Sequence, residues 1–183
     1  MQRIPYPDAA TLTPLVRQML AATPLNVVRI CAHASPSLFE AQGRLGMAVA
    51  DPEVLDPPLR ETVILRVAYL SNSEYELHHH VPLARSAGLT EAQLTAIAHR
   101  DYGDLPPQLA AAARFTDEVV TQLAPSDATL AALRAVASDR VVINIVLAIG
   151  CYMSIARLIA VTAIERDADA IGRLPTRLEE EAR

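Results

Sequence analysis

The chain has 183 residues, 51% of them apolar and 20% charged, which excludes a disordered protein and fits a single domain spanning residues 1–183. Its net charge is −5 and all sixteen basic residues are scattered arginines, so nothing indicates nucleic-acid binding. Cys31 and Cys151 lie far apart and form neither a CxxC pair nor a zinc ligand set, so a reduced, cytoplasmic protein is expected.

We expect neither a signal peptide nor a membrane span. The first ten residues, MQRIPYPDAA, carry Pro and Asp where a signal peptide needs an apolar core. The longest apolar stretch, residues 141–156, is shorter than the roughly 20 residues that cross a bilayer, and Arg157 follows it directly. The stretch is therefore predicted to be a helix buried in the core or at a subunit interface, without membrane contact.

The sequence predicts an all-α fold. Ala, Leu, Arg and Glu fill the periodic segments, and no segment alternates apolar and polar residues as a half-buried strand would. Residues 1–24 are interpreted as an N-terminal extension, and residues 167–183 as a charged tail that is frayed or packed on a neighbour. From Pro, Gly and capping signals, helices are expected near residues 9–22, 25–33, 36–50, 58–71, 73–87, 91–99, 106–123, 127–137 and 140–165.

Glu76 and His80 lie on the apolar face of the helix expected at 73–87. At about 100° per residue they share a stripe with Ser73 and Leu77, and a spacing of four lets the carboxylate and the imidazole meet. Burying both is costly unless they bond to each other or to a ligand. A carboxylate fixes the tautomer of an imidazole and increases its basicity, so one hypothesis is a general acid/base pair. The alternative is a structural pair that ties two helices together.

Glu61 repeats this pattern at the start of the preceding helix, where it shares a stripe with Ile64 and Leu65. Spacing alone does not place Glu61 near His80. A Glu in a first helical turn is also explained by its favourable interaction with the helix dipole. The sequence therefore leaves the role of Glu61 open.

The segment from Leu59 to Ile97 resembles the core of the carboxymuconolactone decarboxylase family, which includes the alkyl hydroperoxidase D-like proteins. The family pattern has a hydrophobic helix that opens with Glu, and then a helix with a Tyr-Glu-Trp-x-x-His or a Cys-x-x-Cys-x-x-x-His signature. Here Tyr-Glu-Leu-His-His-His occupies residues 75–80, with Leu77 in place of the Trp, and Gly-Leu-Thr-Glu follows at 88–91. Ile-Gly-Cys-Tyr at 149–152 also resembles the family, and the likeness covers residues 25–165.

This resemblance implies an alkyl hydroperoxidase D-like helical bundle of about eight helices with a central helical hairpin. It also implies a homo-oligomer (dimer, trimer or hexamer) with the active site near a subunit interface. In the peroxidase branch two Cys perform thiol–disulfide chemistry, but Ser73 and Glu76 stand at those positions here. CxxC-dependent peroxidase activity is therefore not expected.

The resemblance is closer to the decarboxylase-type branch, so we expect a carboxy-lyase or isomerase that acts on a small carboxylated lactone or ring acid. Such chemistry needs no metal or organic cofactor when the electron pair delocalises into a neighbouring carbonyl. His80 is expected to move the proton, oriented by Glu76, with Glu61 as a second acid or orienting group. The groups expected to bind or surround the substrate are Ser73, Tyr152, His33 and a carboxylate-binding arginine, Arg66 or Arg157.

One alternative hypothesis is an alkyl hydroperoxidase-like protein without CxxC chemistry, and two further hypotheses stay open. Glu61, Glu76 and His80 have the ligand types of a divalent-metal site, whereas the three consecutive rings of His78 to His80 project about 100° apart and cannot share one ion. Alternatively, the protein is an oligomer without catalytic activity.

Overall fold

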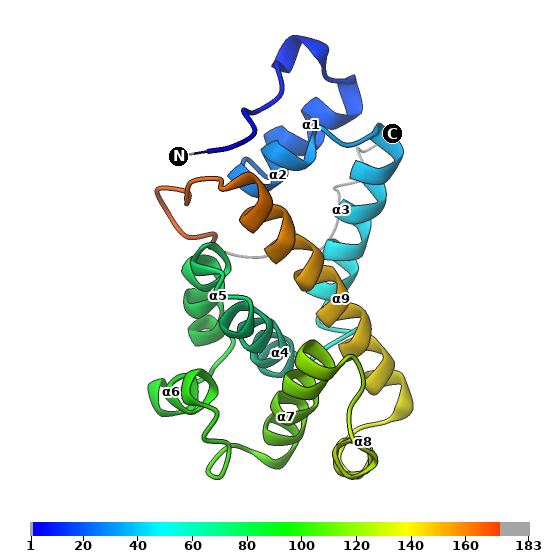
Figure 1. Ribbon diagram of the computed structural model, residues 1–183, viewed down its shortest axis with the longest axis vertical. Helices are drawn as coiled ribbons and strands as arrows, with labels where there is room; N and C mark the ends of the chain where they lie inside the picture. Colours follow the sequence, from blue (N-terminus) through cyan, green and yellow to red (C-terminus); the bar gives the residue numbers. More distant parts are fainter. Residues whose placement is uncertain (1, 173–183) are drawn as a thin grey trace.

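The computed structural model describes residues 2–172, and this part of the chain is all-helical (Figure 1). The expectation of an all-α bundle is thus confirmed. The elements are η1 (Ala9–Thr11), α1 (Pro14–Ala22), α2 (Asn26–Cys31), α3 (Pro36–Ala50), α4 (Pro57–Leu70), α5 (Glu74–Ser86), α6 (Glu91–His99), α7 (Pro107–Gln122), α8 (Asp127–Arg134) and α9 (Asp139–Thr162).

The expected helix at residues 9–22 is divided in two. Pro14 stands in the first turn of α1, and the residue before it, Thr13, is extended and accepts a hydrogen bond from the Val16 N–H. Because a residue before proline is disfavoured in the helical region, the chain cannot run straight from η1 into α1. The other expected helices are confirmed, with ends that differ by a few residues.

Helix α4 forms the centre of the core. Ten of its fourteen residues are buried, and it packs against α5, α7 and α9 (Figure 1). The apolar residues around its circumference, among them Val63, Leu65 and Val67, are fully buried, as expected for a helix enclosed on all sides. Helices α4 and α5 form the expected hairpin, which turns at Asn72 with a left-handed backbone (φ +50°) that asparagine tolerates.

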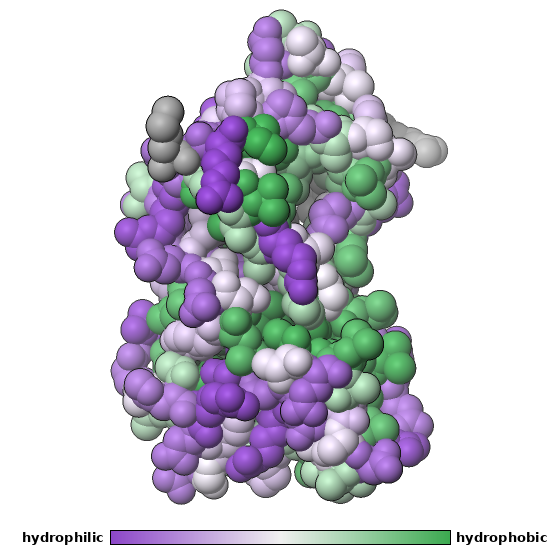
Figure 2. All heavy atoms as spheres, viewed as in Figure 1, coloured by the Kyte–Doolittle hydropathy of each residue, from purple (hydrophilic) through white to green (hydrophobic). Residues whose placement is uncertain are grey.

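Helix α9 joins two groups of helices. Figure 1 shows α1 to α3 at one end of the molecule and α4 to α8 at the other, with α9 running between them. By length and composition α9 is apolar enough to cross a membrane, and 44% of its most apolar window is buried inside the protein. Its exposed side carries large apolar residues, and Figure 2 shows a hydrophobic band across the middle of this face, where α9 crosses in Figure 1.

Candidate active site

Glu61 and His80 form a buried pair across the α4–α5 hairpin. The Glu61 side chain is fully buried, and its Oε2 lies 2.8 Å from Nδ1 of His80. Arg60, the preceding residue, donates from Nε to Glu61 Oε1 at 2.9 Å and from Nη1 to the Ala50 carbonyl at the end of α3 at 2.7 Å. A carboxylate held at both oxygens in this way fixes the imidazole with its proton on Nδ1 and leaves Nε2 directed elsewhere.

This pairing corrects the expectation that Glu76 orients His80. The i,i+4 spacing allows the contact, but the hydrogen bond of His80 goes to Glu61, nineteen positions away on the neighbouring helix. The hairpin turn at residues 71–73 folds the two helices together, so that Glu61 and His80 face each other. The residue whose role was open is therefore the one that holds the imidazole.

Glu76 has a buried carboxyl group without a partner. The residue is 2% exposed, and neither of its oxygens has a hydrogen-bond partner within the part of the chain that the structure describes. Burial raises the pKa of Glu76 to about 8, only partly offset by the Ser73 hydroxyl. At neutral pH the side chain is therefore mostly a neutral carboxylic acid, which can donate a proton.

Tyr152 of α9 lies over the edge of His80, with ring centroids 5.0 Å apart and planes at 84°. Burial raises the pKa of the Tyr152 phenol well above its usual value, and the negative charge of Glu61 acts in the same direction. Glu76 also raises this pKa whereas Arg60 lowers it, so all of these groups lie within electrostatic reach of one phenol. Helices α4, α5 and α9 thus supply one polar cluster inside the protein.

Ser73 and Cys151 border this cluster. The Ser73 hydroxyl caps α5 by accepting the Glu76 N–H at 3.4 Å, so it positions the first turn that carries Glu76. Gln42 of α3 donates to the Cys151 sulfur at 3.5 Å, and burial raises the pKa of that thiol to about 11. Burial raises the pKa of Cys31 to about 11 as well. Neither cysteine is an effective thiolate nucleophile near neutral pH.

Residues 36–118 match the model of the Carboxymuconolactone decarboxylase family. The match covers 83 of the 183 residues, and this part of the chain is similar to that family. The matched region contains α3 to α7 apart from the last residues of α7, and with them Arg60, Glu61, Glu76 and His80. No curated protein sequence matches the chain.

Two solved structures share the fold of this chain. One is a protein of unknown function from Agrobacterium tumefaciens, linked by its name to the antioxidant defence protein AhpD; it has a TM-score of 0.66 and 24% identity, over 75% of this chain and 96% of its own. The other is the alkylhydroperoxidase AhpD core of an uncharacterised peroxidase-related protein from Ralstonia eutropha. It has a TM-score of 0.76 and 19% identity, over 91% of this chain and 93% of its own. At these identities the likeness establishes the fold alone.

The guanidinium of Arg66 is already occupied by hydrogen bonds to residues outside the polar cluster. Its guanidinium is 1% exposed, donates from Nε to Asp117 at 2.8 Å and from Nη1 to the Ile97 carbonyl at 2.6 Å. Arg157 is exposed and bonds along its own helix to the Met153 carbonyl. The contacts of both arginines are therefore structural, and neither is placed to hold a substrate carboxylate.

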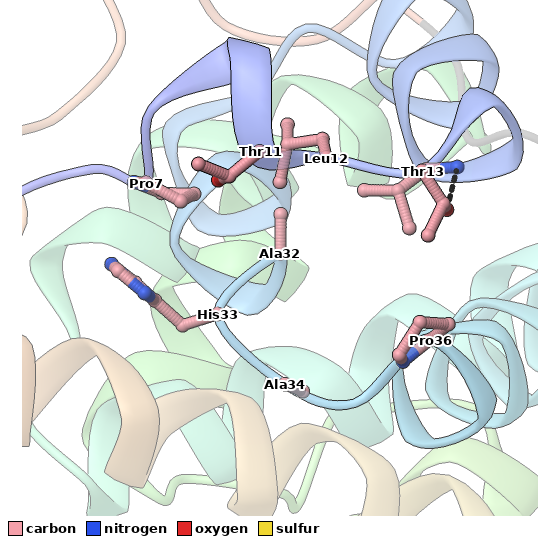
Figure 3. A pocket seen from close by; sticks show the side chains of 9 residues that line it. Pro7, Thr11, Leu12, Thr13, Ala32, His33, Ala34 and Pro36 are labelled. Carbon is pink, nitrogen blue, oxygen red and sulfur yellow. Dashed lines mark hydrogen bonds between the residues drawn. The ribbon is translucent and has the colours of Figure 1, made fainter.

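His33 lies outside the polar cluster. It is exposed, and its Nε2 lies 2.7 Å from the Pro5 carbonyl oxygen. His33 lines a pocket of about 210 Å³ formed by the N-terminal segment, the end of α2 and the start of α3. Figure 3 shows the side chains that line this pocket, His33 among them. None of the residues that line this pocket is Glu61, Glu76 or His80.

The acidic and imidazole groups do not converge as metal ligands. Within residues 2–172, no group of three or more His, Cys, Asp or Glu side chains has a geometry that could hold a metal ion. Glu61 is already bonded to Arg60 and His80. The Glu61–Glu76–His80 set therefore gives no geometric support for the metal hypothesis.

Sequence reasoning missed two residues of this region. The first is Arg60, which is adjacent to Glu61. The feature of the sequence that could have indicated it is a charged residue within a helix that is apolar on nearly all sides. Asp167 accepts hydrogen bonds from the Tyr75 hydroxyl and the Asn26 N–H, and it lies 3.1 Å from Nε2 of His79. No local pattern indicates Asp167, because its partners lie about ninety or more positions away.

Proposed function

We propose that this protein is a cofactor-independent enzyme that moves protons on a small carboxylated lactone or ring acid, as a decarboxylase or an isomerase. The observation that carries the proposal is the buried carboxyl group of Glu76, which has no hydrogen-bond partner among residues 2–172 and lies one helical turn before His80 of the Glu61–His80 pair. Burial raises the pKa of this carboxyl group to about 8. Two titratable groups held in different protonation states are a typical arrangement for acid/base catalysis.

The assigned roles follow from the contacts. Glu61 accepts the Nδ1–H of His80, so that Nε2 carries a lone pair that can take a proton from carbon or oxygen. Glu76 donates its proton, and Tyr152 forms a wall against the imidazole ring. Ser73 holds the backbone turn from which Glu76 projects.

For decarboxylation, the carbon–carbon bond to the departing carboxylate breaks and CO₂ leaves. The electron pair delocalises into the conjugated carbonyl, and the proton of Glu76 is added to the carbon. Glu76 then regains a proton from solvent by way of His80. For isomerisation, His80 removes a proton from one carbon and Glu76 delivers one to another. The delocalised electron pair makes a metal or an organic cofactor unnecessary in either case.

The test is incubation of the purified protein with 4-carboxymuconolactone and related lactone acids in deuterated buffer. Release of CO₂ with deuterium at the former carboxyl carbon supports decarboxylation, and deuterium exchange or double-bond migration without CO₂ supports isomerisation. His80→Gln is expected to lower kcat by about 10²–10⁴-fold. The exposed His99→Gln variant should leave kcat unchanged. If no lactone or ring acid is turned over, or His80→Gln retains full activity, the proposal is wrong.

A further inference from the structure

Arg60 brings a guanidinium group to the Glu61–His80 pair and does not use all of its donors there. Nε is bonded to Glu61 and Nη1 to the Ala50 carbonyl, whereas Nη2 makes no hydrogen bond with any residue between 2 and 172. The side chain retains 9% of its surface exposed, and Nη2 is not one of the fully buried side-chain atoms that lack a hydrogen-bond partner. A guanidinium fixed on two sides is preorganised to bind a carboxylate with the donors that are left.

The charges around Arg60 leave the cluster able to take up an anion. Arg60 and Glu61 neutralise each other as an ion pair, and Glu76 is predominantly uncharged at neutral pH. No uncompensated carboxylate therefore repels a negative ligand.

Decarboxylation itself restricts which carboxylate Arg60 can hold. Negative charge leaves the departing carboxylate as the carbon–carbon bond breaks, so a cation on that group would stabilise the ground state more than the transition state. A guanidinium is useful only on a carboxylate that the substrate retains. A decarboxylation substrate for this site consequently has at least two carboxylates, and an isomerisation substrate at least one.

We propose that Arg60 is a substrate-binding residue, which holds the retained carboxylate of a lactone acid through Nη2 while Glu61 and Ala50 fix its guanidinium. This inference rests on the proposed function for the class of substrate. It does not depend on turnover, because the binding of a lactone acid to the protein is measured directly.

The experiment measures binding of muconolactone, a lactone with one carboxylate, and of its uncharged methyl ester by isothermal titration calorimetry. Wild-type protein is expected to bind the acid at least tenfold more tightly than the ester. Arg60→Gln should bind both forms with the affinity of the ester. Arg44→Gln, which alters an exposed arginine paired with Glu40 on α3, should behave as wild type.

Arg60→Lys covers the case in which Arg60→Gln does not fold. Lysine keeps the charge without the guanidinium fork, so affinity for the acid should fall at least threefold and affinity for the ester should not change. The inference is overturned if wild type does not prefer the acid, or if the preference persists in every Arg60 variant that folds. A preference that Arg60→Gln abolishes, in a protein that turns over no lactone acid, supports the Arg60 site and contradicts the proposed function.

Discussion

Glu61 Oε2 and His80 Nδ1 are 2.8 Å apart at the centre of the α4–α5 hairpin, and both side chains are buried. The contact joins two helices and at the same time fixes one imidazole nitrogen, so it has a structural and a chemical consequence. If its importance is chemical, the two residues act as a unit, and removing either one disables the other.

A double-mutant cycle separates these consequences. We expect Glu61→Gln and His80→Gln each to lower kcat by about 10²-fold or more, and the double variant to be little worse than His80→Gln alone. Unfolding free energies are measured for the same four proteins by urea denaturation. Losses of activity that simply multiply in the double variant would contradict a shared catalytic role.

The titration of Glu76 gives stability a distinctive pH dependence. Its pKa is about 8 in the folded protein against an ordinary value of 4.5, so between these pH values the folded state binds a proton that the unfolded state has lost. The unfolding free energy contributed by this group is therefore complete below pH 4.5 and is lost as pH rises towards 8, by at most about 1.4 kcal/mol per pH unit. Urea denaturation between pH 5 and 9 measures the slope.

Glu76→Gln removes the titration and is expected to flatten that slope. Glu53→Gln, which changes an exposed carboxylate, is the matched control and should retain it. The same titration predicts that kcat falls above pH 8, because the acid form of Glu76 is then lost. Equal slopes in wild type and Glu76→Gln would show that Glu76 is already ionised in the folded protein.

The helices were predictable from the sequence because their signals are local. Thr90 and Gln93 form the capping box that begins α6, and Pro107 occupies the first turn of α7. Such signals depend on residues within one helical turn of each other, so no tertiary information is needed. The same applies to the burial of Glu76, which follows from its place on an apolar stripe.

The partners of the polar residues were not predictable in the same way. His80 has a potential partner at i−4, Glu76, and another across the hairpin, Glu61, and only the packing of α4 on α5 decides between them. Arg66 likewise looks available on α4, but its partner Asp117 lies 51 positions later on α7. Tertiary packing determines these pairs, and sequence spacing does not record it.

Asp117 should be one of the most sensitive positions for stability. Its carboxylate is 3% exposed and accepts hydrogen bonds from Arg66, from Arg100 at 3.0 Å and from the Tyr102 hydroxyl at 2.7 Å. Asp117→Asn leaves the buried guanidinium of Arg66 without a counter-charge, so we expect a loss of about 3–5 kcal/mol in unfolding free energy. Urea denaturation checks this, with the exposed Asp104→Asn as the control.

The exposed apolar face of α9 provides a test of self-association. Ile143 is 58% exposed and Leu147 53%, one helical turn apart on the same face, whereas monomers seldom expose such patches. If this face is the oligomer interface, Ile143→Glu with Leu147→Glu should lower the mass measured by light scattering after size exclusion. Ala128→Glu on the exposed side of α8 should not. An unchanged mass in the double variant would place the interface elsewhere.

The segment after α9 is anchored to α5 by Asp167, and this contact should respond to acid. Nδ1 of His79 accepts the Ile171 N–H at 3.0 Å, so the proton of the neutral ring lies on Nε2, which donates to Asp167 at 3.1 Å. Burial lowers the pKa of His79, with the neighbouring rings of His78 and His80 acting in the same direction and Asp167 against it.

Because the folded state favours neutral His79, stability from this group is present above its ordinary pKa of 6.5 and is lost as pH falls below it. We expect His79→Gln to lose less unfolding free energy than wild type between pH 7 and 5, and His99→Gln to follow wild type. Asp167→Asn should cost about 1–3 kcal/mol at pH 7, since it weakens the contacts with His79 and Tyr75. Chemical denaturation at each pH measures the unfolding free energy of the three variants and of wild type. If His79→Gln loses as much unfolding free energy as wild type between pH 7 and 5, the titrating group is not His79.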